Sequence, residues 1–217
     1  MTNGSKNEVM PYAADGVRGF LHRPHESKGD GLVLVHGAGS NAQAPLLEAA
    51  ATTFAEAGIW ALRCDLPFRQ RKPHGPPSPA DAAADRANLR EAARELRILA
   101  HGRIFLGGHS YGGRQATMLA AEDPQVADAL LLFSYPLHPP NQPDKWRTAH
   151  FPQLRTPAMF VHGTKDTFGS PDEMRTALRL PPARTSLTIL DRAGHELLRG
   201  KFDLASLVVA PFLNFVQ

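Results

Sequence analysis

The sequence predicts an α/β fold in which helices cover both faces of a mostly parallel, twisted sheet. Short aliphatic segments alternate with segments of helical periodicity along most of the chain. The aliphatic segments lack polar alternation, which indicates strands buried on both faces, as in parallel sheets. Polar groups that can act as acid, base or nucleophile follow the ends of these segments, where α/β proteins bind ligands.

The first half of the chain supplies two strands and two helices. The aliphatic run at 31–37 predicts a strand, and the segment 45–57, with a proline in its first turn and a glycine after its end, predicts a helix. A strand is expected at 59–67 and an amphipathic helix at 80–100. The four prolines of 68–79 predict a loop without regular structure.

The second half continues the alternation around a long loop at 137–155. Ser170 and Pro171 are typical of a helix start. The first thirty residues are expected to add one or two antiparallel strands around 17–23. The remaining expected elements are strands at 103–108, 129–136, 157–163 and 185–190 and helices at 112–122, 170–178 and 201–216.

Composition limits the classes of protein. A chain of 217 residues is expected to form one domain, 1–217. The net charge of +3 is dispersed and predicts no nucleic-acid partner. The N-terminus lacks the apolar core of a signal peptide, and no apolar run approaches a membrane span, so we expect a cytoplasmic protein without a membrane partner.

Cysteine and histidine usage argue against cofactors. Cys64 is the single cysteine, which excludes an internal disulfide, and its place in a strand pattern predicts a buried thiol. The ten histidines show no ligand spacing, so no metal and no organic cofactor are expected. The predicted partner is a small-molecule substrate, and the oligomeric state is open between monomer and homodimer.

The segment GHSYG (108–112) matches the G-x-S-x-G nucleophile elbow between a predicted strand and a predicted helix. Side chains two residues from the serine would collide with the neighbouring strand and helix, and glycine removes them. Ser110 then projects at the head of the helix, whose partial positive charge stabilises a developing oxyanion. The alternative is an ordinary glycine-rich turn with an idle serine.

Serine needs a base, and the base needs an acid that holds it in one tautomer. Asp166 follows the strand at 157–163, and His195 follows the last strand, which gives the order serine, acid, histidine. Asp172 and Asp191 are rival acids, although Asp191 is close to His195 in sequence. A capping aspartate and a surface-loop histidine are the alternative interpretations.

Two main-chain N–H groups are expected to form an oxyanion hole. Tyr111 follows the nucleophile, and Ala38 lies in the turn HGAGS (36–40) after the first long strand. The rival interpretation of GAGS as a phosphate-binding loop lacks the G-x-G-x-x-G spacing and a Walker lysine.

The chain resembles an α/β-hydrolase, in particular a small capless subgroup related to dienelactone hydrolase-like proteins and to vertebrate testis-expressed and NSL-complex hydrolase-like proteins. The resemblance covers about 31–196 and implies the triad Ser110, Asp166 and His195. Gln43 departs from the acidic residue frequent in the subgroup. The motifs that carry it are LVHGAGS, RCDLPF, GGHSYGGR, YPLHPPNQPDKWRTAHFPQLRTPAMF, GTKDTFG and the final GH.

The segment after 129–136 is short and rich in proline, which leaves no room for a multi-helix lid and predicts an open, shallow pocket. Residues expected to contact substrate lie just beyond strand ends. Arg69 and its basic neighbours Arg71, Lys72 and His74 either hold a substrate carboxylate or phosphate or form a solvated loop. The candidate substrate-binding residues are Phe68, Arg69, Tyr135, His138 and Phe168.

The sequence thus predicts a serine hydrolase of small carboxylic esters or lactones that forms an acyl-enzyme at Ser110. Two alternatives remain: a hydrolase-fold binding or scaffold protein without turnover, and perhydrolysis by the same triad.

Overall fold

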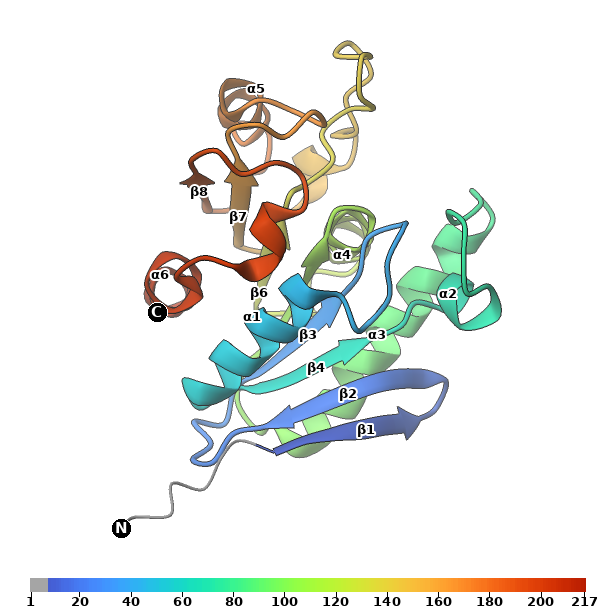
Figure 1. The fold of residues 1–217 in the computed structure, drawn as a ribbon, viewed down its shortest axis with the longest axis vertical. Coiled ribbons are helices and arrows are strands. Elements are labelled where there is room, and N and C mark those ends of the chain that lie inside the picture. The colour runs from blue at the N-terminus through green and yellow to red at the C-terminus, as the bar shows by residue number, and fades with distance from the viewer. Residues whose placement is uncertain (1–7) are drawn as a thin grey trace.

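A computed structural model of the chain describes residues 8–217, and one eight-stranded sheet runs through it (Figure 1). The spatial order of the strands is β1-β2-β4-β3-β5-β6-β7-β8. Their bounds are β1 Glu8–Ala14, β2 Val17–Arg23, β3 Gly31–Val35, β4 Trp60–Cys64, β5 Ile104–His109, β6 Ala129–Phe133, β7 Ala158–Gly163 and β8 Thr185–Leu190.

Strand direction places the chemistry at one edge of the sheet. β1 pairs with β2, and β2 with β4, in antiparallel register, whereas every pair from β4 to β8 is parallel. The carboxyl ends of six strands therefore meet at the same edge, and the loops that follow them converge there. The antiparallel hairpin expected before residue 30 is confirmed as β1 and β2.

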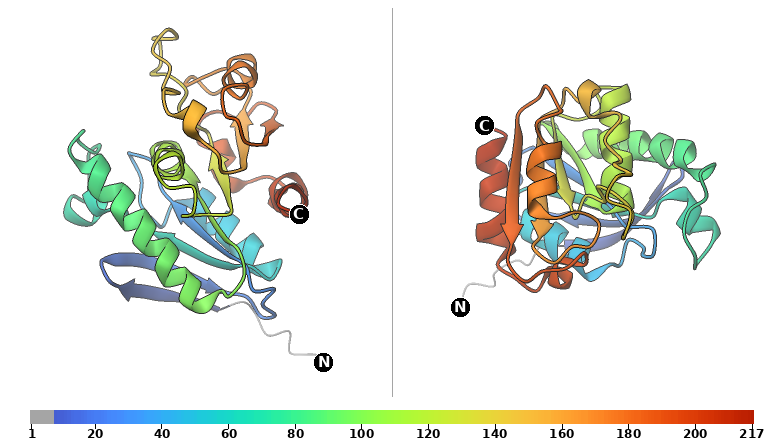
Figure 2. Two further views of the ribbon diagram at one scale, coloured as in Figure 1. Left: turned by 180° about the vertical axis from the view of Figure 1, so that it is seen from behind. Right: turned by 90° about the horizontal axis from the view of Figure 1, so that it is seen from above.

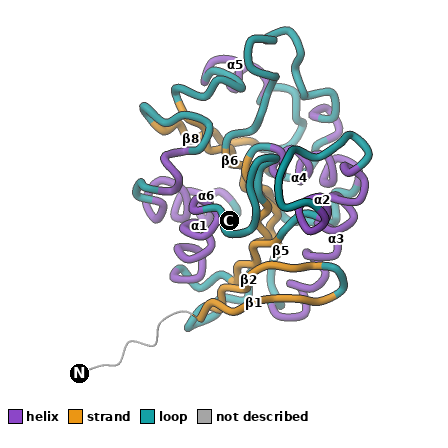
Figure 3. Tube along the Cα trace, turned by 45° about the vertical axis from the view of Figure 1, so that its right-hand side comes forward, coloured by secondary structure: helices purple, strands orange, loops and turns teal. Residues whose placement is uncertain are grey.

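Helices cover both faces of this sheet (Figures 2 and 3). On β3, Leu32 and Leu34 belong to the apolar core on one face of the sheet, while Val33 and Val35 belong to the core on the other face. This division follows from the alternation of side chains along a strand. The helices are α1 Pro45–Glu56, α2 Pro67–Arg71, α3 Asp81–Leu99, α4 Tyr111–Glu122, α5 Pro171–Ala177 and α6 Ala210–Phe215.

Most predicted elements are confirmed, and two predictions need correction. The stretch 68–79 is not wholly a loop, because α2 begins with Pro67 at its first position, where proline is tolerated, and the four later prolines follow its end. The closing helix predicted at 201–216 is interrupted. A π-helical turn at Ala205–Val209 precedes α6, next to Pro211, which has no N–H to donate.

The segment between β6 and β7 contains one short 3₁₀ turn, Phe151–Gln153. Within the described part of the chain no cap domain covers the edge of the sheet, as predicted. Among residues 8–217, no helix combines the length and apolar character that crossing a bilayer requires.

Candidate active site

The elbow after β5 has the strained geometry that its sequence predicts. Ser110 lies between β5 and α4 with φ 51° and ψ −114°, in a region that residues other than glycine seldom occupy. A Cβ on Gly108 would lie 2.4 Å from the carbonyl oxygen of Val35, and one on Gly112 would lie 2.6 Å from that of His36. The two glycines therefore let β3 approach the turn, and the strain orients the Ser110 hydroxyl.

The three predicted triad residues come together at this edge. The Nε2 atom of His195 lies 2.7 Å from the Oγ atom of Ser110. Its Nδ1 atom lies 2.9 Å and 3.0 Å from the two carboxylate oxygens of Asp166. Loops after β5, β7 and β8 supply the three side chains, from positions 85 and 29 residues apart.

Asp166 stays ionised despite its burial. Its side chain is fully buried, which opposes ionisation, but the hydrogen bond from His195 and the N–H of Phe168 hold its pKa below the usual value. The carboxylate of Asp166 accepts a hydrogen bond from the N–H group at Nδ1 of His195. This leaves the Nε2 lone pair facing Ser110, the tautomer that a general base needs.

The rival acids lie elsewhere. Asp191 and Asp172 are exposed, with side chains 81% and 92% accessible. Asp191 accepts a hydrogen bond from Thr164, and Asp172 forms an ion pair with Arg175. Neither contacts His195, whereas both carboxylate oxygens of Asp166 do.

The two predicted oxyanion donors flank the serine. The first hydrogen bond of α4 runs from the N–H of Arg114 to the carbonyl of Ser110. The main-chain N–H of Tyr111 lies before it and therefore has no acceptor within the helix. Ala38 and Ser110 together line both cavities at this edge. The assignment of these two N–H groups to the oxyanion remains a prediction.

Arg69 is not at a substrate surface, contrary to our expectation. It is buried and donates to four main-chain carbonyls, those of Ala38 and Ser40 at 2.7 Å and those of Lys72 and Gly75 at 3.0 Å. All of these acceptors belong to loops, so Arg69 fixes the loop of Ala38 against the chain after α2. Its guanidinium N–H groups are therefore engaged in hydrogen bonds within the protein.

Three further predictions of substrate contact are wrong, because the side chains are in the core. Phe68 is 1% exposed and packs edge-on against Tyr111 behind the nucleophile. Tyr135 is fully buried and donates its hydroxyl to the carbonyl of Arg147. His138 is buried, and its Nδ1 atom bonds the carbonyl of Pro139. None of the three lines a cavity at Ser110.

Phe168 lies at the site as predicted. Its ring stacks on the imidazole of His195 with centroids 4.2 Å apart, and it lines both cavities. Its main-chain N–H also donates to Asp166. Phe168 therefore restricts the orientation of both the imidazole of His195 and the carboxylate of Asp166.

Sequence reasoning missed three residues that support the triad. His109 bonds the main-chain carbonyl of His195 through Nε2 at 2.8 Å. His162, at the end of β7, bonds the carbonyl of Gly169 and lies 3.8 Å from Asp166. Asp85 accepts a hydrogen bond from the hydroxyl of Tyr111. An aspartate on the buried stripe of a predicted helix was the signal that could have revealed Asp85.

Two cavities open at Ser110 and share Ala38, Ser110 and Phe168. The "His195 cavity", about 390 Å³, also contains His195, Glu196 and Arg199 in its lining. The "arginine cavity", about 490 Å³, is lined instead by Arg114, Arg147, Tyr111, Gln115 and the prolines at 76, 77, 79 and 136. A substrate that straddles Ser110 can place one part in each.

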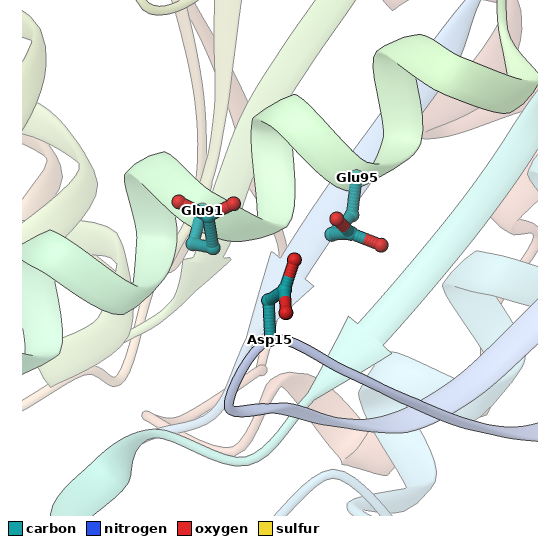
Figure 4. A group of neighbouring side chains, drawn as sticks. All are labelled: Asp15, Glu91 and Glu95. Carbon is teal, nitrogen blue, oxygen red and sulfur yellow. The ribbon is translucent and has the colours of Figure 1, made fainter.

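A group of carboxylates that could hold a cation lies away from this site. Figure 4 shows Asp15, in the β1–β2 turn, facing Glu91 and Glu95 on α3. Tyr12 donates its hydroxyl to Glu95, and none of the three acids lines a cavity at Ser110. Acidic groups of this kind are common without a metal, and we assign the cluster no role.

A serine on a strained strand-to-helix turn, bonded to a histidine that a buried aspartate orients, defines the serine-nucleophile class of α/β proteins. Residues 28–206 match the alpha/beta hydrolase domain family, so the chain belongs to that family, as the sequence predicted. Hydrolysis is the class of reaction that the family supports.

Solved structures share the fold at low identity. TT1662 from Thermus thermophilus is 20% identical with a TM-score of 0.78, covering 98% of this chain and 99% of its own. A dienelactone hydrolase from Anabaena variabilis is 22% identical with a TM-score of 0.67 and 95% coverage of both chains. XC6422 from Xanthomonas campestris, described as a serine hydrolase without lid, is 14% identical with a TM-score of 0.70, covering 97% and 95%.

Proposed function

We propose that the chain is a serine hydrolase of small carboxylic esters or lactones that works through an acyl-enzyme at Ser110. The observation that carries the proposal is the 2.7 Å contact between Ser110 Oγ and His195 Nε2, with Nδ1 of the same ring bonded to a buried anion. This is the geometry of a nucleophile with its base in the correct tautomer.

Acylation follows from this geometry. The oxygen of Ser110 attacks the ester carbonyl as His195 Nε2 takes its proton, and the N–H groups of Ala38 and Tyr111 bind the oxyanion. The tetrahedral intermediate collapses when the carbon–alkoxide bond breaks. His195 gives the proton to the departing alkoxide, which leaves as the alcohol.

Deacylation repeats the sequence with water. His195 removes a proton from water as its oxygen attacks the acyl carbon, and the bond to Ser110 then breaks with return of the proton to Oγ. Asp166 stabilises the imidazolium in both halves without taking the proton. The products are a carboxylic acid and an alcohol, which are parts of one hydroxy acid when the substrate is a lactone.

The absence of a cap supports small acyl groups over long ones, because an uncovered site buries little of a long chain. A panel of 4-nitrophenyl esters of rising chain length tests this. We expect kcat/KM to be highest for short and medium chains, and a steep rise towards long chains would contradict the open-site argument.

Labelling with a fluorophosphonate separates an enzyme from a scaffold. We expect the folded protein to be labelled at Ser110, and the Ser110→Ala variant to remain unlabelled. No labelling of folded native protein, together with no ester hydrolysis, would favour the binding or scaffold alternative.

A further inference from the structure

The arginine cavity contains two positive side chains next to the nucleophile. Arg114 follows Ser110 by one turn of α4, so it lies on the same helix face, and long helical side chains lean towards the N-terminus, here towards Ser110. Its side chain lines the cavity, and its Nε atom is buried without a hydrogen-bond partner among the described residues. No described carboxylate forms an ion pair with this guanidinium, so its charge is available to an anionic ligand.

Arg147 reaches the same cavity from the segment between β6 and β7. Its main chain is fixed by two hydrogen bonds of 2.7 Å, one from its own N–H to the carbonyl of Leu137 and one from the hydroxyl of Tyr135 to its carbonyl. Among residues 8–217, its guanidinium makes a single hydrogen bond, a long one of 3.5 Å to the carbonyl of Pro136. Burial and the charge of Arg114 lower the pKa of Arg147.

No neighbouring acid neutralises this pair within the described part of the chain. Asp85 is engaged by the hydroxyl of Tyr111 and the N–H of Phe68. Glu122 forms an ion pair with Arg86. Burial lowers the pKa of His150 to about 4, so this ring is neutral at pH 7.

The chemistry of the leaving group decides which part of the substrate enters this cavity. His195 must reach the departing alkoxide to protonate it, so the alcohol portion belongs in the His195 cavity, which the imidazole lines. The arginine cavity is lined by Ser110 but not by His195. The acyl portion therefore extends into the arginine cavity.

We propose that Arg114 and Arg147 bind a carboxylate at the far end of the acyl chain, so that half-esters of short dicarboxylic acids are the preferred substrates. A guanidinium matches a carboxylate with two parallel hydrogen bonds, which gives the acyl chain a fixed direction. The proposal rests on the proposed function, since it names the acyl group that Ser110 receives. Hydrolysis then releases a dicarboxylate and an alcohol by the steps given above.

Two matched esters test the proposal. In 4-nitrophenyl hydrogen adipate a carboxylate replaces the terminal methyl group of 4-nitrophenyl hexanoate, and the rest of the acyl chain is the same. We expect the native protein to show a kcat/KM at least about 10-fold higher for the adipate ester. An equal or lower value for the adipate ester would overturn the proposal.

Substitutions of the two arginines test whether they cause the preference for the adipate ester. Arg147→Gln and Arg114→Gln should each lower the ratio of the two kcat/KM values by about 10-fold or more, while Arg147→Lys keeps part of it because the charge remains. Arg90→Gln is the matched control, since Arg90 pairs with Asp123 and lines neither cavity at Ser110, and it should leave the ratio unchanged. A ratio that persists in both glutamine variants would refute the assignment.

A binding measurement separates this proposal from the proposed function. If neither ester is hydrolysed and Ser110 is not labelled, the proposed function fails, and calorimetry on the Ser110→Ala variant decides the anion site. Saturable binding of monomethyl adipate that is lost on adding Arg147→Gln, with no binding of methyl hexanoate, supports the site. Equal binding of both compounds, or of neither, overturns it.

Discussion

The substitution Asp166→Asn tests the role of the buried carboxylate with almost no change in shape. In the native site one oxygen, Oδ1, accepts from the N–H of Phe168, and both oxygens accept from Nδ1 of His195. In the variant, the N–H of Phe168 still needs an acceptor, so the amide oxygen takes the position of Oδ1. The amide NH₂ then occupies the position of Oδ2 and presents a donor to Nδ1.

This exchange reverses the tautomer of His195. Nδ1 must now accept, so the ring proton moves to Nε2 and points at Ser110, where a base is needed. We expect kcat to fall by about 10⁴-fold, the effect seen for this change in a serine protease triad, which corresponds to about 5.4 kcal/mol of activation free energy.

The assay is the steady-state hydrolysis of 4-nitrophenyl acetate, with thermal unfolding as a check that the variant is folded. Asp191→Asn and Asp172→Asn are the controls, because both side chains are exposed and neither contacts His195. A folded Asp166→Asn protein that keeps kcat within about 10-fold, or a loss of 100-fold in either control, would refute the assignment of the acid.

Three further predictions concern the surroundings of the triad. Gly112→Ala places a Cβ 2.6 Å from the carbonyl oxygen of His36 and should lower the melting temperature by about 5–10 °C. Gly39→Ala is the control, because a Cβ there has no atom within 4 Å and should leave the melting temperature unchanged. Equal melting temperatures for the two variants would contradict the packing argument. Arg69→Gln removes the side chain that donates to four loop carbonyls and should lower kcat for adipate and hexanoate esters alike. A loss confined to the adipate ester would instead indicate that Arg69 contacts the substrate. Burial lowers the pKa of His22 from 6.5 to about 4, so the unfolded chain binds the proton first as the pH falls. Its contribution to the free energy of unfolding, up to about 3 kcal/mol, is present above pH 6.5 and is lost towards pH 4, as urea titrations across this range should show.

The meeting of Ser110, Asp166 and His195 at one edge could be predicted because each position depends on a local pattern. The elbow needs glycines at fixed offsets from the serine, and GHSYG has them. Asp166 and His195 follow predicted strands, and parallel strands bring their carboxyl ends to one edge whatever the separation in sequence. The strand at 185–190 was predicted with its observed bounds, since turn residues flank it.

The surroundings of the triad could not be predicted in the same way. A basic residue just after a strand looks like a substrate contact, and Arg69 does follow β4. Its four acceptors, however, lie in loops on either side of it in the sequence, and only folding shows that they surround it. Phe68 and Tyr135 likewise lie beyond strand ends, but the direction of their side chains depends on packing against Tyr111 and Phe151.

The sequence by itself determined the alternation of strands and helices, the missing cap and the three side chains that meet at one edge, because periodicity and glycine spacing act over a few residues. The tertiary structure alone decided which positive side chains are hydrogen-bonded within the protein and which line a cavity at Ser110. Arg69 is enclosed by carbonyls, whereas Arg114 and Arg147, from a helix and a distant loop, line one cavity without a counter-charge among the described residues. Burial and pairing of a charge depend on contacts between segments far apart in the chain, and such contacts leave no local pattern.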